Sequence, residues 1–194
     1  GTALRSLHAA GIQPDFHFEI ERNLITYNAL LSIDDAEYMQ GINFVGINVI
    51  FPEVFGLFSR VGMVYRVNDL GSKMFGKNCA ITGHVNPTVG NAGLAIPLRL
   101  GFEQLYMFGI DMGYRDAERH HSRNTVYYDS SQSIQPYRES EAPTEVEGNF
   151  GGVVYSNRIF LWMRDVMNSL VSRAPHATIY NCSDGAKVEG EIGR

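Results

Sequence analysis

The run INFVGINVI at positions 42–50 constrains the fold most strongly, because it is almost continuously apolar. Such a run is typical of a strand covered on both faces, as in a parallel sheet. The rest of the chain alternates between two patterns. Strand-like runs occupy 14–20, 61–67, 103–110 and 177–181, and helical patterns occupy 3–12, 23–32, 87–100 and 157–173. This alternation predicts an α/β protein with a mostly parallel, doubly wound sheet and helices on both faces.

Length and composition suit one globular domain. The chain has 194 residues, 44% of them hydrophobic, so we expect a single domain over 1–194. The net charge of −5 argues against a nucleic-acid partner, which usually needs a basic face. No apolar run reaches the roughly 18–20 residues of a membrane span. The distant cysteines, Cys79 and Cys182, indicate reduced thiols and a cytoplasmic location.

The stretch 111–156 differs from the rest because it is polar and has no hydrophobic period. We expect it to form a polar excursion or lid outside the core. It contains RHHSRNTVYYD at 119–129, in which His121 is a candidate general base near neutral pH. A solvated loop is the alternative for this stretch. Adjacent histidines seldom converge on one ion, so we expect no metal here.

Acidic side chains follow two of the predicted strands. Asp111 lies two residues after Gly109 at the end of the strand-like run 103–110, and Glu21 follows the run 14–20. In doubly wound sheets, ligands bind beyond the carboxyl ends of the strands. Asp111 and the nearby Tyr114 are therefore candidate ligand contacts. The alternative is that Asp111 caps a turn.

The stretch NPTVGNAGLAI at 86–96 places small residues just before a helical pattern. Free backbone N–H groups at the helix N-terminus, together with the hydroxyl of Thr88, would form an anion site. The alternative is an N-capped helix in which Gly90 permits close packing against the sheet. Spacing alone leaves both interpretations open.

In this order, the segments resemble the conserved domain of bacterial motility accessory factors. The segments that carry the resemblance are GTALRSLHAAGIQPDFHFEIERN, PTVGNAGLAIPLRLGFEQLYMFGIDMGY, HHSRNTVYYD and NCSDGAKVEG. The resemblance implies a glycosyltransferase that moves a CMP-activated nonulosonic acid, a sialic-acid-like sugar, to Ser or Thr of flagellin. No cofactor is required for that reaction.

The same domain family includes archaeal 6-hydroxymethyl-dihydropterin pyrophosphokinases, which use ATP and a divalent cation such as magnesium. An enzyme of that kind is the first alternative function. A non-catalytic module that binds a nucleotide or flagellin is the second.

Residues 86–114 are also similar to the core of bacterial CMP-dependent sialyltransferases, which implies a sialyltransferase-like Rossmann fold. Thr88, Val89 and Gly90 match a Thr-Ser-Gly turn, with Val89 in place of Ser. Gly109, Ile110 and Asp111 match a Gly-Ile-Asp motif. The stretch 121–125 resembles the segment that carries the histidine base of those enzymes, which implies a catalytic role for His121.

The resemblance also implies which part of the ligand each binding residue contacts. Gly1, Thr2 and Glu21 would line the nucleotide. Thr88, Gly90 and Asn91 would meet its phosphate. Gly109, Asp111 and Tyr114 would shape the donor site. The family carries a Gly-Pro-Ser phosphate loop upstream of the segment that matches Gly1, so we expect this chain to be a fragment of a longer protein.

Overall fold

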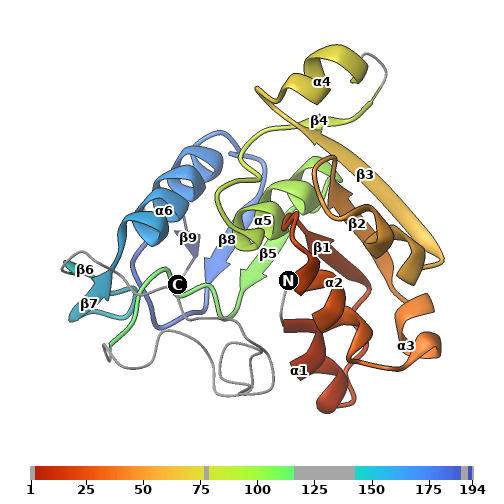
Figure 1. The fold of residues 1–194 in the computed structure, drawn as a ribbon. Helices are drawn as coiled ribbons and strands as arrows, with labels where there is room; N and C mark the ends of the chain where they lie inside the picture. Colours follow the sequence, from red (N-terminus) through yellow and green to blue (C-terminus); the bar gives the residue numbers. More distant parts are fainter. Residues whose placement is uncertain (1–2, 77–78, 116–142, 189–191, 194) are drawn as a thin grey trace. The chain divides into compact units, whose positions relative to one another are not determined.

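A computed structural model of the chain describes residues 3–76, 79–115, 143–188 and 192–193 (Figure 1). Gly1, Thr2 and His121 lie outside the described residues. The described chain forms two compact units. The first takes residues up to 83, and the second begins at 84. The prediction of one domain over 1–194 stays a prediction, and each unit is described by itself.

The first unit contains a parallel sheet in the strand order β1-β2-β3-β4. The strands are β1 (Phe16–Glu19), β2 (Asn43–Ile47), β3 (Arg60–Arg66) and β4 (Ile81–Thr82). The apolar run 42–50 supplies β2, but the strand ends at Ile47 because the chain then turns. The N–H of Ile50 donates to the oxygen of Ile47 at 3.2 Å. The predicted strand is therefore correct in type and too long at its end.

The helices of the first unit are α1 (Ala3–Ala9), α2 (Leu24–Leu31), α3 (Ala36–Gln40), the 3-10 helix η1 (Pro52–Leu57) and α4 (Leu70–Phe75). Three of them begin at an Asn or Asp whose side chain accepts a backbone N–H of the first turn. These caps are Asn23, Asp35 and Asp69. The most deeply buried apolar side chains of this unit include Leu4, Ile42, Phe44, Ile47 and Val54.

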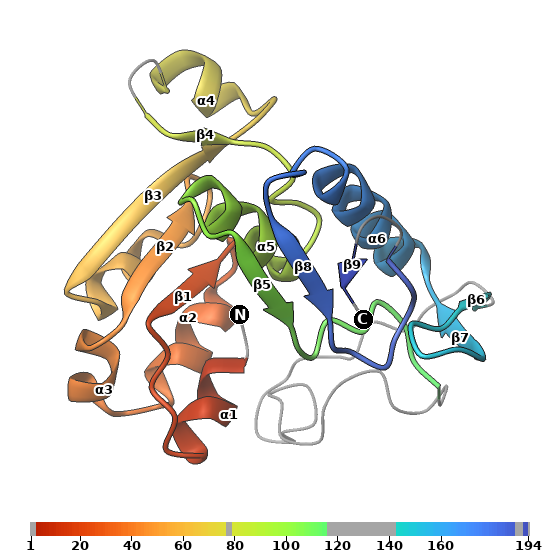
Figure 2. The same ribbon diagram turned by 180° about the vertical axis from the view of Figure 1, so that it is seen from behind.

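The second unit contains a parallel sheet in the order β5-β8-β9. The strands are β5 (Gln104–Met107), β8 (Thr178–Asn181) and β9 (Ile192–Gly193). Two helices, α5 (Val89–Arg99) and α6 (Arg158–Val171), lie beside β5 and β8 (Figure 2). One apolar cluster joins both helices to both strands, so the helices cover the same face of the sheet. Its members include Leu94, Leu98, Met107, Met163, Met167 and Ile179.

Part of the predicted polar excursion is an antiparallel hairpin of β6 (Thr144–Glu147) and β7 (Val153–Ser156). Residues 116–142 of the predicted excursion lie outside the described residues. Within the described ranges, no helix is both long and apolar enough to cross a membrane. The predicted Rossmann-like α/β class with mostly parallel strands is confirmed.

Candidate functional site

The candidate site of the second unit is the edge of the sheet where β5 and β8 end. Because these strands are parallel, the residues that follow them meet at one edge. The N–H of Ile110 donates to Oγ of Ser183 at 2.9 Å. Oγ of Ser183 in turn donates to the main-chain oxygen of Met107 at 3.3 Å. One buried hydroxyl thus joins the two strand ends.

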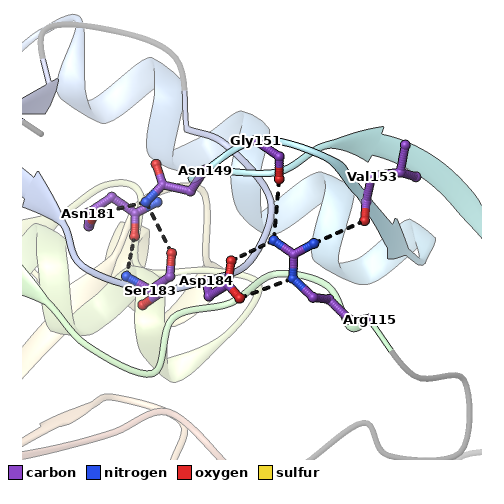
Figure 3. A network of polar contacts seen from close by, with 7 residues as sticks. All are labelled: Arg115, Asn149, Gly151, Val153, Asn181, Ser183 and Asp184. Carbon is purple, nitrogen blue, oxygen red and sulfur yellow. Dashed lines mark hydrogen bonds and ion pairs between the residues drawn. The ribbon is translucent and has the colours of Figure 1, made fainter.

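The turn between β6 and β7 fixes the path of the chain after β8 (Figure 3). Nδ2 of Asn149 donates to the main-chain oxygens of Asn181, at 2.9 Å, and Ser183, at 3.0 Å. The N–H of Asn149 donates to the oxygen of Gly185 at 2.8 Å. Oδ1 of Asn181 accepts the N–H of Ser183 at 3.1 Å. These bonds satisfy backbone groups that would otherwise lie at the end of a strand without partners.

The backbone of Asp111 lies directly against residues 182–188, which follow β8 and are called the post-β8 loop here. Its main-chain oxygen accepts the N–H of Ala186 at 2.6 Å. A Cβ atom at position 185 would overlap the main chain of Asp111, so only glycine fits at Gly185 without a shift of the backbone. The chain also reaches Asp111 through Gly109, whose φ of +68° favours glycine. Gly109 and Gly185 therefore fix the position of the Asp111 main chain, from which its carboxylate side chain extends.

The side chain of Asp111 is exposed, and it forms no hydrogen bond or ion pair with another of the described residues. Surrounding protein atoms remove part of the water around the carboxyl group and so raise the pKa of Asp111, and the negative charge of Asp184 raises it further. The ionised carboxylate can accept hydrogen bonds from hydroxyl or amide groups of a ligand. The same negative charge disfavours a phosphate directly beside it.

Asp184, by contrast, forms an ion pair with Arg115 through both carboxylate oxygens. Nη2 and Nε of Arg115 lie 2.6 Å and 3.0 Å from the two carboxylate oxygens of Asp184, which is a bidentate arrangement (Figure 3). The guanidinium also donates to the main-chain oxygens of Gly151, at 3.3 Å, and Val153, at 3.4 Å. The hydrogen bonds and charge of Arg115 lower the pKa of Asp184.

The N-terminus of α5 lies at the same edge of the sheet. A Cβ on Gly90 would come within 3.2 Å of Cδ1 of Ile110 and within 2.5 Å of Cε of Met163. Gly90 is therefore closely packed, and a Cβ there would require the ends of these side chains to move, which supports the packing alternative raised by the sequence. A role for its backbone at a phosphate stays a prediction.

Asn91 also has a structural role, because its fully buried side chain is already used within the protein. Oδ1 accepts hydrogen bonds from the N–H and the hydroxyl of Thr88, each at 3.1 Å. Nδ2 donates to the main-chain oxygen of Met163 at 3.0 Å. The side chains of Thr88 and Asn91 thus hold the start of α5, and their predicted contact with phosphate stays a prediction.

Tyr114 is buried and continues the hairpin rather than projecting freely. It exchanges two backbone hydrogen bonds with Tyr155, at 2.8 Å and 2.9 Å. Oγ of Ser156 donates to the oxygen of Met112 at 2.9 Å. The segment from Asp111 to Arg115 is therefore fixed along its length to β7 and to the post-β8 loop.

In the first unit, Glu21 follows the carboxyl end of β1, as predicted. Its N–H and that of Ile20 both donate to Oε1 of Glu19, at 2.9 Å and 2.8 Å. Glu19 is almost completely buried, whereas Glu21 is exposed. Partial loss of water around its carboxyl group, and then the charge of Glu19, raise the pKa of Glu21. The structure thus places Asp111 and Glu21 after the carboxyl ends of β5 and β1.

Sequence reasoning did not assign roles to Arg115, Asn149, Ser183 or Asp184. The last two could have been found by the rule that ligands and polar groups gather after the carboxyl ends of strands, because they follow β8. For the parts of the chain with a described structure, no three His, Cys, Asp or Glu side chains gather in a way that could hold a metal ion.

Comparisons with known proteins agree with this fold. The profile of the family described as 6-hydroxymethylpterin diphosphokinase MptE-like matches residues 1–117. The structure of the MAf glycosyltransferase from Magnetospirillum magneticum AMB-1 is similar with a TM-score of 0.80 and 33% sequence identity. The similarity covers 98% of this chain and 28% of that chain. A comparison with curated proteins gives no match.

The chain therefore spans little more than a quarter of the solved protein that it matches. The motility accessory factor resemblance seen in the sequence is confirmed by both findings. The chain belongs to the 6-hydroxymethylpterin diphosphokinase MptE-like family, and its fold is similar to that of a glycosyltransferase.

Proposed function

We propose that the chain is part of a glycosyltransferase that transfers a CMP-activated nonulosonic acid to Ser or Thr of flagellin. The observation that carries this proposal is the similarity to the MAf glycosyltransferase, at 33% identity over 98% of the chain. The polar edge of the second unit supports it, because the edge combines a helix N-terminus with an exposed carboxylate.

These two features suit different parts of a nucleotide sugar. Backbone N–H groups at the start of α5 favour a phosphate, with Thr88, Gly90 and Asn91 at that position. The carboxylate of Asp111 suits hydroxyl or amide groups of the sugar, with Gly109 and Tyr114 shaping its surroundings. Gly1, Thr2 and Glu21 would line the nucleotide. In this proposal the helix N-terminus meets the anionic phosphate, and the carboxylate of Asp111 meets hydrogen-bond donors of the sugar.

In the proposed reaction, the acceptor hydroxyl oxygen attacks the anomeric carbon of the sugar. The bond from that carbon to the phosphate oxygen breaks, and CMP leaves with the electron pair. His121 takes the proton of the hydroxyl as general base. Hydrogen-bond donors directed at the leaving phosphate stabilise its developing charge. This reaction requires no metal from the protein.

The test is transfer by the full-length protein, with flagellin and a CMP-activated nonulosonic acid, followed by mass spectrometry of flagellin peptides. We expect a mass increase of one sugar residue on Ser or Thr. His121→Ala should abolish transfer and leave CMP binding within about twofold, since a general base contributes mainly to the chemical step. An unchanged transfer rate in His121→Ala would remove the base assignment.

The name of the matching family favours one alternative, a pterin diphosphokinase that uses ATP and magnesium. Magnesium is often held by substrate phosphates with only one or two protein carboxylates. Calorimetric titration separates the two functions. CMP binding without a metal supports the transferase, and metal-dependent ATP binding with no response to CMP supports the kinase. Ligand binding without turnover, unaffected by His121→Ala, would indicate a non-catalytic module.

A cytoplasmic location and the absence of a nucleic-acid partner stay predictions.

A further inference from the structure

One guanidinium group joins three segments beside Asp111. Arg115 ends the segment that begins at Asp111, and it reaches Asp184 of the post-β8 loop at 2.6 Å and 3.0 Å. It also reaches the oxygens of Gly151 and Val153 at the β6–β7 turn (Figure 3). Asp111 is held by the same loop, through the N–H of Ala186. The five-residue segment is therefore attached to one loop at both of its ends.

We propose that Arg115 and Asp184 are a positioning pair that orients the carboxylate of Asp111 toward the donor sugar. The pair keeps the post-β8 loop against the main chain of Asp111, and Arg115 neutralises the charge of Asp184. This proposal rests on the proposed function only for the identity of the ligand, which is the donor sugar. The geometry of the pair is independent of it.

The charges of Asp184 and Arg115 affect the pKa of Asp111 in opposite directions. Asp184 carries a negative charge that raises the pKa of Asp111, and Arg115 offsets that charge. The other charged groups that the hairpin and the post-β8 loop bring together are Glu147 and Lys187, which pair with each other at 2.8 Å. Further titratable side chains on the described packed segments are Tyr114, Tyr155 of β7 and Glu145 of β6.

This arrangement supplies a matched control. Lys187 and Glu147 join the same loop and the same hairpin as Arg115 does, by an ion pair of similar length. Within the described part of the chain, neither member of that pair forms a hydrogen bond or ion pair with Asp111. Replacing Lys187 by Gln therefore removes a comparable tie without changing the charge at Asp184.

The experiment compares Arg115→Gln, Asp184→Asn and Lys187→Gln in the full-length protein. The first readout is calorimetric binding of CMP and of a CMP-activated sialic acid. The second is the ¹³C carboxyl shift of Asp111 against pH, which requires no ligand. We expect Arg115→Gln to weaken binding of the CMP-activated sugar about tenfold and CMP binding less than twofold, and we expect Lys187→Gln to change neither.

In the titration, the two members of the pair should act in opposite directions. Arg115→Gln should raise the pKa of Asp111, because the charge of Asp184 is no longer offset. Asp184→Asn should lower it, because that charge is gone. Shifts in the same direction would overturn the electrostatic part of the proposal, and equal effects of Lys187→Gln and Arg115→Gln on binding of the CMP-activated sugar would overturn the positioning part. Should Arg115→Gln fail to fold, the near-isosteric Asp184→Asn replaces it in the binding comparison, and unchanged binding of the CMP-activated sugar by that variant would overturn the proposal. If the parent protein binds neither ligand, the proposed function fails while the titration still tests the pair.

Discussion

The side-chain amide of Asn91 in α5 donates a 3.0 Å hydrogen bond to the main-chain oxygen of Met163 in α6. The oxygen of the same amide accepts two hydrogen bonds from Thr88 at the start of α5. One buried side chain therefore fixes the beginning of one helix and its attachment to another. A residue to which the family resemblance gives a role in phosphate binding thus also holds this part of the fold together.

Replacing Asn91 by Ala should lower the free energy of unfolding of the second unit by about 1–3 kcal/mol, since buried groups lose their hydrogen-bond partners. Urea unfolding followed by the fluorescence of Trp162, the one tryptophan of the sequence, measures this. Asn28→Ala, at an exposed position of α2, is the control and should change stability by less than about 0.5 kcal/mol. Equal effects of the two substitutions would contradict the structural role.

The two glycines of α5 should respond differently to alanine. No atom lies within 4 Å of a Cβ placed on Gly93, so Gly93→Ala should stabilise the second unit by about 0.5–1 kcal/mol through helix propensity. A Cβ on Gly90 requires Met163 to move, so Gly90→Ala should gain less or lose stability. Thermal unfolding of both variants measures the difference. A gain at Gly90 as large as that at Gly93 would show that packing does not require glycine there.

Replacing Asp111 by Asn should weaken binding of the CMP-activated sugar by roughly ten- to a hundredfold, the range expected for a lost charge-assisted hydrogen bond. Because the pKa of Asp111 is raised, its carboxylate is lost at a higher pH than for an ordinary aspartate. Binding should therefore weaken as the pH falls through that raised value, and Asp111→Asn should remove this dependence. Calorimetry over a pH series tests both points. Asp165→Asn, at an exposed position of α6, should leave them unchanged.

The stability of the first unit should depend on His17. Burial lowers the pKa of His17 well below its ordinary value of 6.5, and its ring stacks on Phe44 and Phe58 with centroids 5.9 Å and 5.8 Å away. Between the lowered and the ordinary pKa, the unfolded chain binds a proton that the native state does not. The free energy of unfolding therefore has its full value above about pH 6.5. At lower pH it decreases, by at most about 1.4 kcal/mol per pH unit.

Urea unfolding by circular dichroism at pH 7.5, 6.5 and 5.5 measures this fall. His17→Phe should reduce the slope, because it removes the titrating group and keeps an aromatic ring. His176→Gln, at an exposed position, should leave the slope as it is. An equal slope in the wild type and His17→Phe would assign the acid sensitivity to other groups.

The longest elements were predictable because their apolar residues follow a clear period. The pattern at 157–173 predicted α6, found at Arg158–Val171. The pattern at 87–100 predicted α5, found at Val89–Arg99 with Pro97 inside it. Both helices bury apolar residues on one face, which is the signal that sequence reasoning detects.

Short elements without such a face were missed. In α4, the buried residue is Ser72, whereas Leu70, Met74 and Phe75 are exposed. The apolar pattern of this helix therefore does not indicate a core. The hairpin of β6 and β7 was missed because most of its residues are polar or exposed, and because its glycines indicate turns more strongly than strands.

The location of the candidate site was predictable, but its internal contacts were not. The carboxyl end of a predicted strand was enough to single out Asp111. The partner of Arg115 lies 69 residues further along the chain. Nothing in the local sequence distinguishes Asp184 from other acidic residues as that partner. Contacts of this kind depend on the tertiary fold, which brings β5, the hairpin and β8 together.

The contact between Gly185 and the main chain of Asp111 also limits how the two positions can change during evolution. A residue with a side chain at 185 would require the backbone at 111 to move first, and no side-chain substitution elsewhere creates that space. The two loops should therefore be inherited as a unit. A homologue that has lost this glycine should also have a different length or path in the loop after β5.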